Sequence, residues 1–114
     1  MTGKIVVLST AGSAEEAEIL ARGLVDARLA ACVNVVPQIR SIYRWQGAVQ
    51  DETEFLLVIK TRRELFPQVQ EKIAHLHSYS APESIVLPIV DGSTAYLDWI
   101  DRETEALEQP GGGV

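Results

Sequence analysis

The sequence predicts an α+β fold in which two helices pack on one face of a four-stranded antiparallel sheet. Three observations support this prediction. The chain has 114 residues, which suits a single domain. Its hydrophobic content of 46% is sufficient for a core. Apolar runs typical of strands alternate with segments of helical periodicity in the order β-α-β-β-α-β-α.

The first strand and the first helix are predicted near the start of the chain. Residues 4–10 (KIVVLST) form a β-branched run that indicates a buried strand. Ser13 begins a helix that ends near Arg28, and Glu16, three residues after Ser13, completes a capping box. The side chains that share one helical stripe are Ala17, Leu20, Ala21, Leu24 and Ala27.

Two long apolar segments on either side of a short turn at Gly47 predict a β-hairpin. Residues 30–45 read as extended, with Pro37 at a bulge or an edge position, and residues 51–61 return antiparallel with apolar side chains on both faces. Sixteen extended residues span ~50 Å, whereas a domain of this size has a radius of gyration of ~13 Å. The hairpin therefore bends at Pro37, projects beyond its own domain, or does both. Its apolar faces need a partner surface, so we expect a homo-oligomer in which hairpins pack on neighbouring subunits.

The second half of the chain completes the sheet and adds a last helix. Pro67 suits the first turn of a second helix. Residues 84–90 (SIVLPIV) read as a fourth strand, in which Pro88 requires an edge or a bulge. A further helix is predicted from about Thr94 to Leu107. The first six elements have the order of the split βαβ, ferredoxin-like sandwich, to which the last helix is an addition.

Composition limits the class of protein. The net charge of −6 argues against a nucleic-acid partner, and no apolar run approaches the ~20 residues of a membrane span. The first ten residues lack the pattern of a signal peptide. The single cysteine excludes an intrachain disulfide and indicates a reducing compartment. We therefore expect a cytoplasmic domain over residues 1–107, followed by a flexible tail at 108–114.

The sequence contains none of the common catalytic motifs. It lacks a phosphate-binding glycine loop, a paired-cysteine zinc pattern and a glycine-flanked nucleophilic serine. We therefore predict that the protein is not an enzyme and requires no cofactor. If it did catalyse a reaction, Ser41 and Tyr79 would be the only candidate catalytic residues.

Three side chains are considered as metal ligands. Cys32 lies in an alternating apolar strand, where it is either a small buried residue or a soft metal ligand or redox thiol. His75 and His77 are two apart on a predicted helix and point ~200° apart, so they cannot chelate one ion while the helix persists. His77 is either a copper or zinc donor or a capping, hydrogen-bonded histidine.

A second group of residues suggests a binding surface near the hairpin turn. Tyr43, Arg44 and Trp45 are either interface residues, since aromatic and Arg side chains are enriched at interfaces, or the walls of a small-molecule cleft. Lys60 and Glu83 either pair with each other or stay exposed, because an uncompensated buried charge is unfavourable. Such a pair is either structural or the polar floor of an anion-binding pocket.

Several short motifs together resemble the CutA divalent-cation-tolerance family. The resemblance covers about residues 4–101, and the motifs occur in the family's order. They are 30–34 (AACVN), 41–47 (SIYRWQG), 59–61 (IKT), 77–79 (HSY), 82–83 (PE), 87–89 (LPI) and 96–99 (YLDW). The agreement of several motifs is much more specific than any one of them.

The resemblance implies a ferredoxin-like subunit with a long protruding hairpin in a homotrimer, similar in architecture to the PII signalling proteins. It implies a part in tolerance to copper and other divalent metals, with no established reaction. It also implies an inter-subunit cleft that gathers the residues at the matching positions, Tyr43, Trp45, Lys60, Tyr79 and Glu83.

The copper donors that the resemblance implies are only partly present. The resemblance implies that copper-binding members of the family have a cysteine at the end of the first strand and two adjacent histidines. The matching positions here hold Ser9, Leu76 and His77. A hydroxyl and an aliphatic chain cannot replace a thiolate and an imidazole, so a bound Cu(II) or other divalent cation depends on His77.

Two functions follow as expectations. The first is a trimeric cytoplasmic protein that acts in divalent metal (copper) tolerance through a binding or regulatory role. The alternative is a PII-like sensor in which Lys60 and Arg44 bind a small anionic metabolite between Tyr43 and Trp45. An enzyme using the same cleft is the least favoured of the functions considered.

Overall fold

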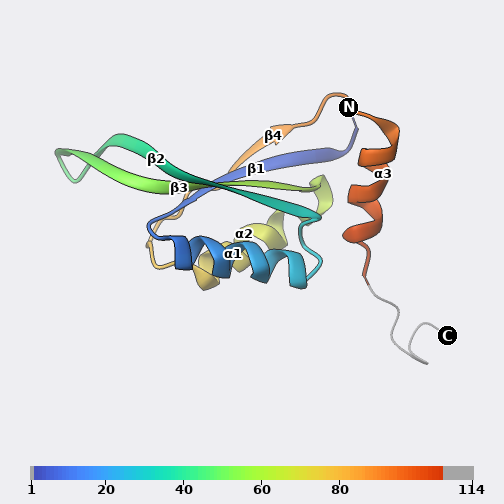
Figure 1. The fold of residues 1–114 in the computed structure, drawn as a ribbon, viewed down its shortest axis with the longest axis horizontal. Coiled ribbons are helices and arrows are strands. Elements are labelled where there is room, and N and C mark those ends of the chain that lie inside the picture. Colours follow the sequence, from blue (N-terminus) through green and yellow to red (C-terminus); the bar gives the residue numbers. More distant parts are fainter. Residues whose placement is uncertain (1, 107–114) are drawn as a thin grey trace.

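The structure, a computed structural model, describes residues 2–106, so the predicted tail at 108–114 and Leu107 lie outside the described residues. The predicted order of elements is confirmed, with an additional 3₁₀ turn, η1 (Figure 1). The elements are β1 (Lys4–Ala11), α1 (Ala14–Asp26), β2 (Cys32–Trp45), β3 (Ala48–Arg62), η1 (Arg63–Leu65), α2 (Phe66–Leu76), β4 (Ile85–Pro88) and α3 (Thr94–Glu103).

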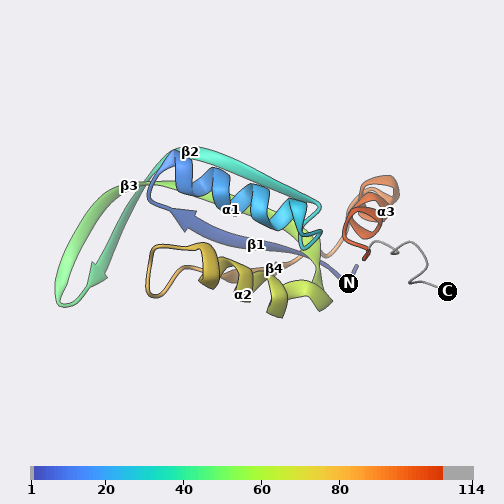
Figure 2. The same cartoon turned by 90° about the horizontal axis from the view of Figure 1, so that it is seen from below.

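The sheet has the strand order β2-β3-β1-β4, and every neighbouring pair is antiparallel. Helices α1 and α2 lie side by side on one face of the sheet (Figures 1 and 2). The α+β ferredoxin-like arrangement with an added C-terminal helix is thus confirmed. Within residues 2–106, no helix has both the length and the apolar character needed to cross a bilayer.

The core lies between the sheet and the two helices. It is built from alternate residues of the strands and from one stripe of each helix, as the periodicity predicts. Ala27, expected on the stripe of the first helix, is exposed because α1 ends at Asp26. The largest fully buried side chains of this core are Ile5, Val7, Leu20, Leu24, Leu57, Ile59, Val69 and Ile73.

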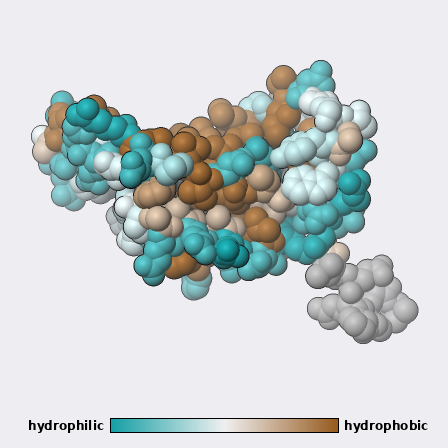
Figure 3. All heavy atoms as spheres, viewed as in Figure 1, coloured by the Kyte–Doolittle hydropathy of each residue, from teal (hydrophilic) through white to brown (hydrophobic). Residues whose placement is uncertain are grey.

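The opposite face of the sheet, here called the open face, is apolar and only partly covered. Helix α3 packs at one end, where Lys4 pairs with Asp101 at 3.1 Å and Arg62 donates to Thr104. The apolar side chains on the rest of the face are half-buried or exposed: Leu56 and Val58 are half-buried, whereas Leu57 and Ile59 on the helix side are buried. Figure 3 shows apolar side chains gathered over the middle of the molecule. The open-face apolar residues are Val6, Leu8, Val36, Leu56, Val58, Ile85 and Leu87.

Strands β2 and β3 form a hairpin that projects along the long axis of the molecule, whose extents are 55 × 32 × 21 Å (Figure 1). Projection of the hairpin is therefore confirmed. Gln46 and Gly47 form its tip with φ angles of 50° and 81°, as expected for a two-residue turn that follows the twist of the strands.

A bulge lies at Pro37 and Gln38, as the sequence predicts. Val36 pairs with Leu56 but Ile39 pairs with Glu54, so β2 carries one extra residue, and Gln38 has a φ of 59°. Because side chains alternate along a strand, this extra residue decides which ones face the open side. An unbulged continuation from Val36 would have placed the even-numbered side chains beyond it on the open face. The bulge places Tyr43 and Trp45 there instead.

Pro88 lies on β4, which pairs only with β1 and is therefore an edge strand, as predicted. Several boundaries differ from the sequence prediction; β3, for example, begins at Ala48 rather than at residue 51. The fourth strand ends at Pro88 rather than at residue 90. Helix α3 ends at Glu103 because side chains bind the carbonyls of its last turn: Arg28 donates to Arg102 O at 3.0 Å and Arg62 donates to Thr104 O at 2.9 Å.

Candidate functional site

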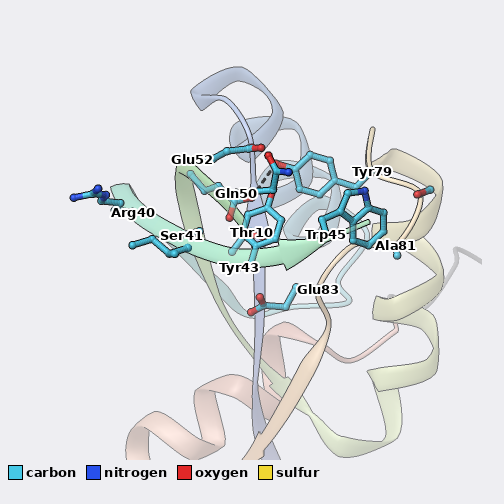
Figure 4. Close-up of a pocket in the computed structure, with 13 residues that line it drawn as sticks. Thr10, Arg40, Ser41, Tyr43, Trp45, Gln50, Glu52, Tyr79, Ala81 and Glu83 are labelled. Atoms are coloured by element: carbon cyan, nitrogen blue, oxygen red, sulfur yellow. Dashed lines mark hydrogen bonds between the residues drawn. The ribbon is translucent and has the colours of Figure 1, made fainter. Parts of the chain in front are cut away.

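A cavity of about 880 Å³ lies at the base of the hairpin, on the same side of the sheet as the open face (Figure 4). This volume is within the range of small-molecule sites. Residues from β2, β3 and the loop between α2 and β4 line it. The side chains that give the cavity its chemistry are Tyr43, Trp45, Glu52, Glu54, Tyr79 and Glu83.

The hairpin register positions the β2 and β3 residues of this cavity. Tyr43 pairs with Gln50 and Ser41 pairs with Glu52, so Tyr43 and Glu52 are diagonal neighbours on one face. The bulge turns Trp45 to the same face. Arg44 alternates with these residues and does not line the cavity, although Arg40 and Ile42, which share its alternation, do.

Tyr79 reaches the cavity from the loop after α2. Its hydroxyl donates a hydrogen bond of 2.8 Å to Glu54 Oε2. The ring passes close to the end of β1, where a Cβ at Gly12 would lie 3.0 Å from the Tyr79 hydroxyl oxygen. The glycine therefore leaves the space that brings Tyr79 and Glu54 together.

Glu54 is the most buried charged residue of the cavity, with 6% of its surface exposed. A buried carboxylate needs hydrogen bonds, and Tyr79 supplies one to Oε2. Within residues 2–106, no hydrogen bond is recorded to the second oxygen, Oε1. A nearly buried carboxylate therefore presents one oxygen without a protein partner at the cavity.

The acidic groups of the cavity influence one another. Burial raises the pKa of Glu83, and the negative charge of Glu54 raises it further. The hydrogen bond to Glu52 raises the pKa of Tyr43, and burial together with the hydrogen bond to Glu54 raises that of Tyr79. Both phenols thus stay neutral, and Tyr79 donates its proton to Glu54.

Arg40 also lines the cavity, but its charge is matched. Its guanidinium donates to both carboxylate oxygens of Asp51, at 2.8 and 2.6 Å, and this contact lowers the pKa of Asp51. In Figure 4, Arg40 points outward on the side away from Trp45 and Tyr79. The remaining charged side chains of the lining are carboxylates.

The structure brings together four of the six predicted cleft residues: Tyr43, Trp45, Tyr79 and Glu83. Lys60 lies elsewhere, paired in register with Cys32, and its Nζ donates to Asn34 Oδ1. The Lys60–Glu83 pair considered from the sequence is thus not formed within one chain. Glu52 and Glu54 were missed, although counting back from the turn at Gly47 places Glu52 beside Tyr43.

His77 is held by backbone groups on both sides of its ring, and 0% of its side chain is exposed. Nε2 lies 2.6 Å from Thr10 O, and Nδ1 accepts from Tyr79 N at 3.0 Å. This pattern places the hydrogen on Nε2 and occupies the lone pair of Nδ1. His77 also caps α2, since its N–H donates to Ile73 O. This geometry agrees with the alternative in which His77 is a capping, hydrogen-bonded histidine.

Glu16 holds the same loop from the other side. Ser13 Oγ accepts from Glu16 N at 3.1 Å, which confirms half of the predicted capping box. The carboxylate does not return to Ser13; it accepts from Gly12 N at 3.4 Å and from Ser78 N at 2.9 Å. Burial opposes ionisation of Glu16, but these hydrogen bonds outweigh it and lower the pKa.

The described residues of one chain form no cluster of potential metal ligands. Within residues 2–106, no three His, Cys, Asp or Glu side chains lie close enough to hold an ion. Cys32 is half-buried, with Sγ 3.8 Å from Asn34 Oδ1, and Ser9 is fully buried in the core. Copper binding by His77 or Cys32 stays a prediction, and for His77 both ring nitrogens are already engaged.

These features define a class of protein: a ferredoxin-like α+β sandwich with a projecting hairpin and a cavity beside it. The family model described as CutA1 divalent ion tolerance protein matches residues 5–103. The chain is 50% identical over 99 residues to the divalent-cation tolerance protein CutA of Thermus thermophilus, covering 87% of this chain and 96% of that protein. This chain belongs to the CutA divalent-cation tolerance family.

Other relatives and solved structures agree. A chloroplastic CutA of Arabidopsis thaliana is 46% identical over 88% of this chain, which spans 55% of that protein. The Thermus thermophilus structure has a TM-score of 0.87 at 48% identity, covering 90% of this chain and 99% of that chain. The CutA1 structure from Oryza sativa has a TM-score of 0.88 at 42% identity, covering 92% and 98%. The sequence resemblance and the predicted fold class are therefore confirmed.

Proposed function

We propose that this chain acts in tolerance to divalent metal ions as a homotrimer, without catalysing a reaction. The family is described by divalent ion tolerance, and the names of the matched relatives include no reaction. The described residues of one chain form no cluster of metal ligands. We therefore expect the assembled protein to act together with a ligand or a partner. Relatives are called chloroplastic or periplasmic, so a cytoplasmic location stays a prediction.

The observation that supports assembly is the open face. The open face continues onto the hairpin, where Tyr43 and Trp45 are exposed, and Ile42 and Val49 are exposed on the other side of the hairpin. Exposed apolar surface of this extent is typical of protein contacts. Further copies of the same chain are the proposed occupants, because a closed ring of identical subunits would cover the open face and the projecting hairpins together. The number three follows from the resemblance to PII-like trimers.

Native mass spectrometry with light scattering tests the assembly. We expect a particle of three times the chain mass. Leu87→Glu, which places a charge on the open face where Leu87 is 46% exposed, should dissociate it. Ile19→Glu is the matched control, because Ile19 is 48% exposed but lies on the outer side of α1. A monomeric parent protein, or equal behaviour of the two variants, contradicts the proposal.

Growth of a strain that lacks the gene tests the metal role. We expect greater sensitivity to divalent metals, restored by the parent chain and by Ile19→Glu but not by Leu87→Glu. A deletion strain whose metal sensitivity equals that of its parent would contradict this role while leaving the assembly untouched.

Binding of a small molecule is the second candidate function. The cavity at the base of the hairpin, with its aromatic walls and a carboxylate oxygen open to it, favours this function. The anionic metabolite expected from the sequence would need a cation from a neighbouring subunit, since Lys60 and Arg44 do not line the cavity in one chain. Titration of small ligands of either charge tests this function.

A further inference from the structure

The start of the loop between α2 and β4 is fixed to the helix layer by one carboxylate. Glu16, in the first turn of α1, accepts from Ser78 N at 2.9 Å through Oε2 and from Gly12 N at 3.4 Å through Oε1. Only 17% of the Glu16 side chain is exposed, and hydrogen bonds to an ionised group are strong where little water competes for them. Glu16 therefore joins α1 and the residue after β1 to this loop.

The next residue of the loop reaches the hairpin. Tyr79 follows Ser78 directly, and its hydroxyl donates to Glu54 Oε2 at 2.8 Å. Glu54 has the same alternation along β3 as Leu56 and therefore lies on the open side of the sheet, whereas α1 covers the other side (Figure 2). Two carboxylates on opposite sides of the sheet thus hold adjacent residues of one loop.

The position of Tyr79 depends on the loop backbone, and a carboxylate holds that backbone better than an amide would. Each oxygen of Glu16 accepts from a different backbone N–H group. Glutamine at this position has a single acceptor oxygen and turns an amide donor toward the other N–H group. A loop donor that loses its acceptor is released, and the segment that carries it gains conformational freedom. Tyr79 then contacts Glu54 for a smaller share of the time.

We propose that Glu16 is a positioning residue for the base of the hairpin: by fixing the loop at Ser78, it keeps Tyr79 on Glu54. The first turn of α1 and the base of the hairpin then behave as one unit, and release of the Glu16 carboxylate loosens both. The inference goes beyond the proposed function. It concerns contacts within one chain and depends neither on a ligand nor on the metal role.

A double-mutant cycle of Glu16→Gln and Tyr79→Phe tests the link between the two contacts. Tyr79→Phe removes only the hydroxyl, at the far end of the side chain from the loop backbone. Guanidinium denaturation at neutral pH and at one fixed protein concentration gives the unfolding constants. We expect the effect of Tyr79→Phe to be at least about twofold smaller in Glu16→Gln than in the parent, because coupled positions depart from independent behaviour by this much or more.

Glu15→Gln is the matched control for this cycle, because Glu15 lies next to Glu16 in the first turn of α1 and is exposed. It removes the same charge from the same end of the helix, so its interaction with the helix dipole is lost in the same way. The effects of Glu15→Gln and Tyr79→Phe should be independent within about twofold. Independent effects in the Glu16 cycle, or an equal departure in the Glu15 cycle, overturn the proposal.

Trp45 gives a second measurement in the folded protein, because it lies on the hairpin and lines the same cavity as Tyr79. In a Trp99→Phe background it is the only tryptophan of the chain. We expect Glu16→Gln to shift the Trp45 emission to longer wavelength and to strengthen its quenching by acrylamide, whereas Glu15→Gln leaves both unchanged. Light scattering ensures that the variants are compared at equal particle mass. Emission and quenching that Glu16→Gln leaves unchanged, or that Glu15→Gln alters equally, overturn the role of Glu16 at the hairpin.

Discussion

The Tyr79 hydroxyl donates a hydrogen bond of 2.8 Å to Glu54 Oε2, and this contact joins the loop after α2 to the base of the hairpin. The hairpin projects from the sheet, so few contacts of its own subunit fix it. The Tyr79–Glu54 pair is one of these contacts, and it also forms the inner wall of the cleft. Stability of the loop and shape of the cleft are therefore coupled.

Tyr79→Phe removes the donor and leaves the nearly buried Glu54 carboxylate without its partner. We expect the free energy of unfolding to fall by about 1.5–3 kcal/mol, the range for a hydrogen bond to a charged group. Guanidinium denaturation at one fixed protein concentration measures this change. Tyr96→Phe, on the exposed side of α3, should change stability by less than about 0.5 kcal/mol. Equal effects at the two positions would contradict the structural role of this contact.

His77→Ala tests whether the buried histidine is a structural residue or a metal ligand. The variant loses the contacts to Thr10 O and Tyr79 N and leaves a cavity, so we expect a loss of about 2–4 kcal/mol. Calorimetric titration of Cu(II) should give the same isotherm for the parent and for His77→Gln, the variant that retains a donor and an acceptor.

His75→Ala is the control for this experiment, because His75 is exposed on α2. Its effect on stability should be within about 0.5 kcal/mol. Saturable binding of one copper ion per subunit that disappears in both His77 variants would identify His77 as a ligand and contradict the interpretation of its hydrogen bonds.

The pH dependence of stability should have opposite signs at two glutamates. The folded-state pKa of Glu83 lies above its ordinary value of 4.5, so the folded state binds more protons there and stability falls as the pH rises through this window. Glu83→Gln should therefore be more stable than the parent at neutral pH, with the difference vanishing below about pH 4.

Glu16 provides the opposite case. Its folded-state pKa lies below 4.5, so its contribution is present at neutral pH and is lost as the pH falls through the folded-state pKa. Glu16→Gln should be less stable than the parent at neutral pH and converge with it in acid. Thermal unfolding between about pH 3 and about pH 8 measures both differences in stability. If both variants were more stable than the parent at neutral pH, or both less stable, the opposite pKa shifts assigned to Glu83 and Glu16 would be contradicted.

Most of the fold could be predicted from local patterns. β-Branched alternation defined β1 and β3, helical spacing defined α1 and α2, and Pro37 indicated the bulge. Each of these features depends on neighbours along the chain or on the period of one element. The end of α3 could not be predicted in this way, because Arg28 and Arg62 bind its last turn from distant elements.

The cleft was less predictable because its composition depends on cross-strand register. Glu52 and Glu54 look like solvated charges on a strand until the bulge and the turn place Glu52 diagonally across from Tyr43 and Glu54 beside Tyr79. The same register turns Arg44 away. A sequence motif brings Arg44 and Tyr43 together, whereas the alternation of a strand separates them onto opposite faces.

The left-handed backbone at Gln38 predicts a last measurable effect. With a φ of 59°, Gln38 occupies a region that a β-branched side chain adopts only with strain. We expect Gln38→Val to lower the free energy of unfolding by about 1–2 kcal/mol and Gln38→Gly to raise it by up to about 1 kcal/mol. At Gln50, in the extended strand opposite Tyr43, the same two substitutions should have the reverse order, since valine favours strands and glycine weakens them. Denaturation of the four variants measures both orders. If valine were better than glycine at both positions, the bulge would not determine how β2 meets β3, and the placement of Tyr43 and Trp45 on the open face would need another cause.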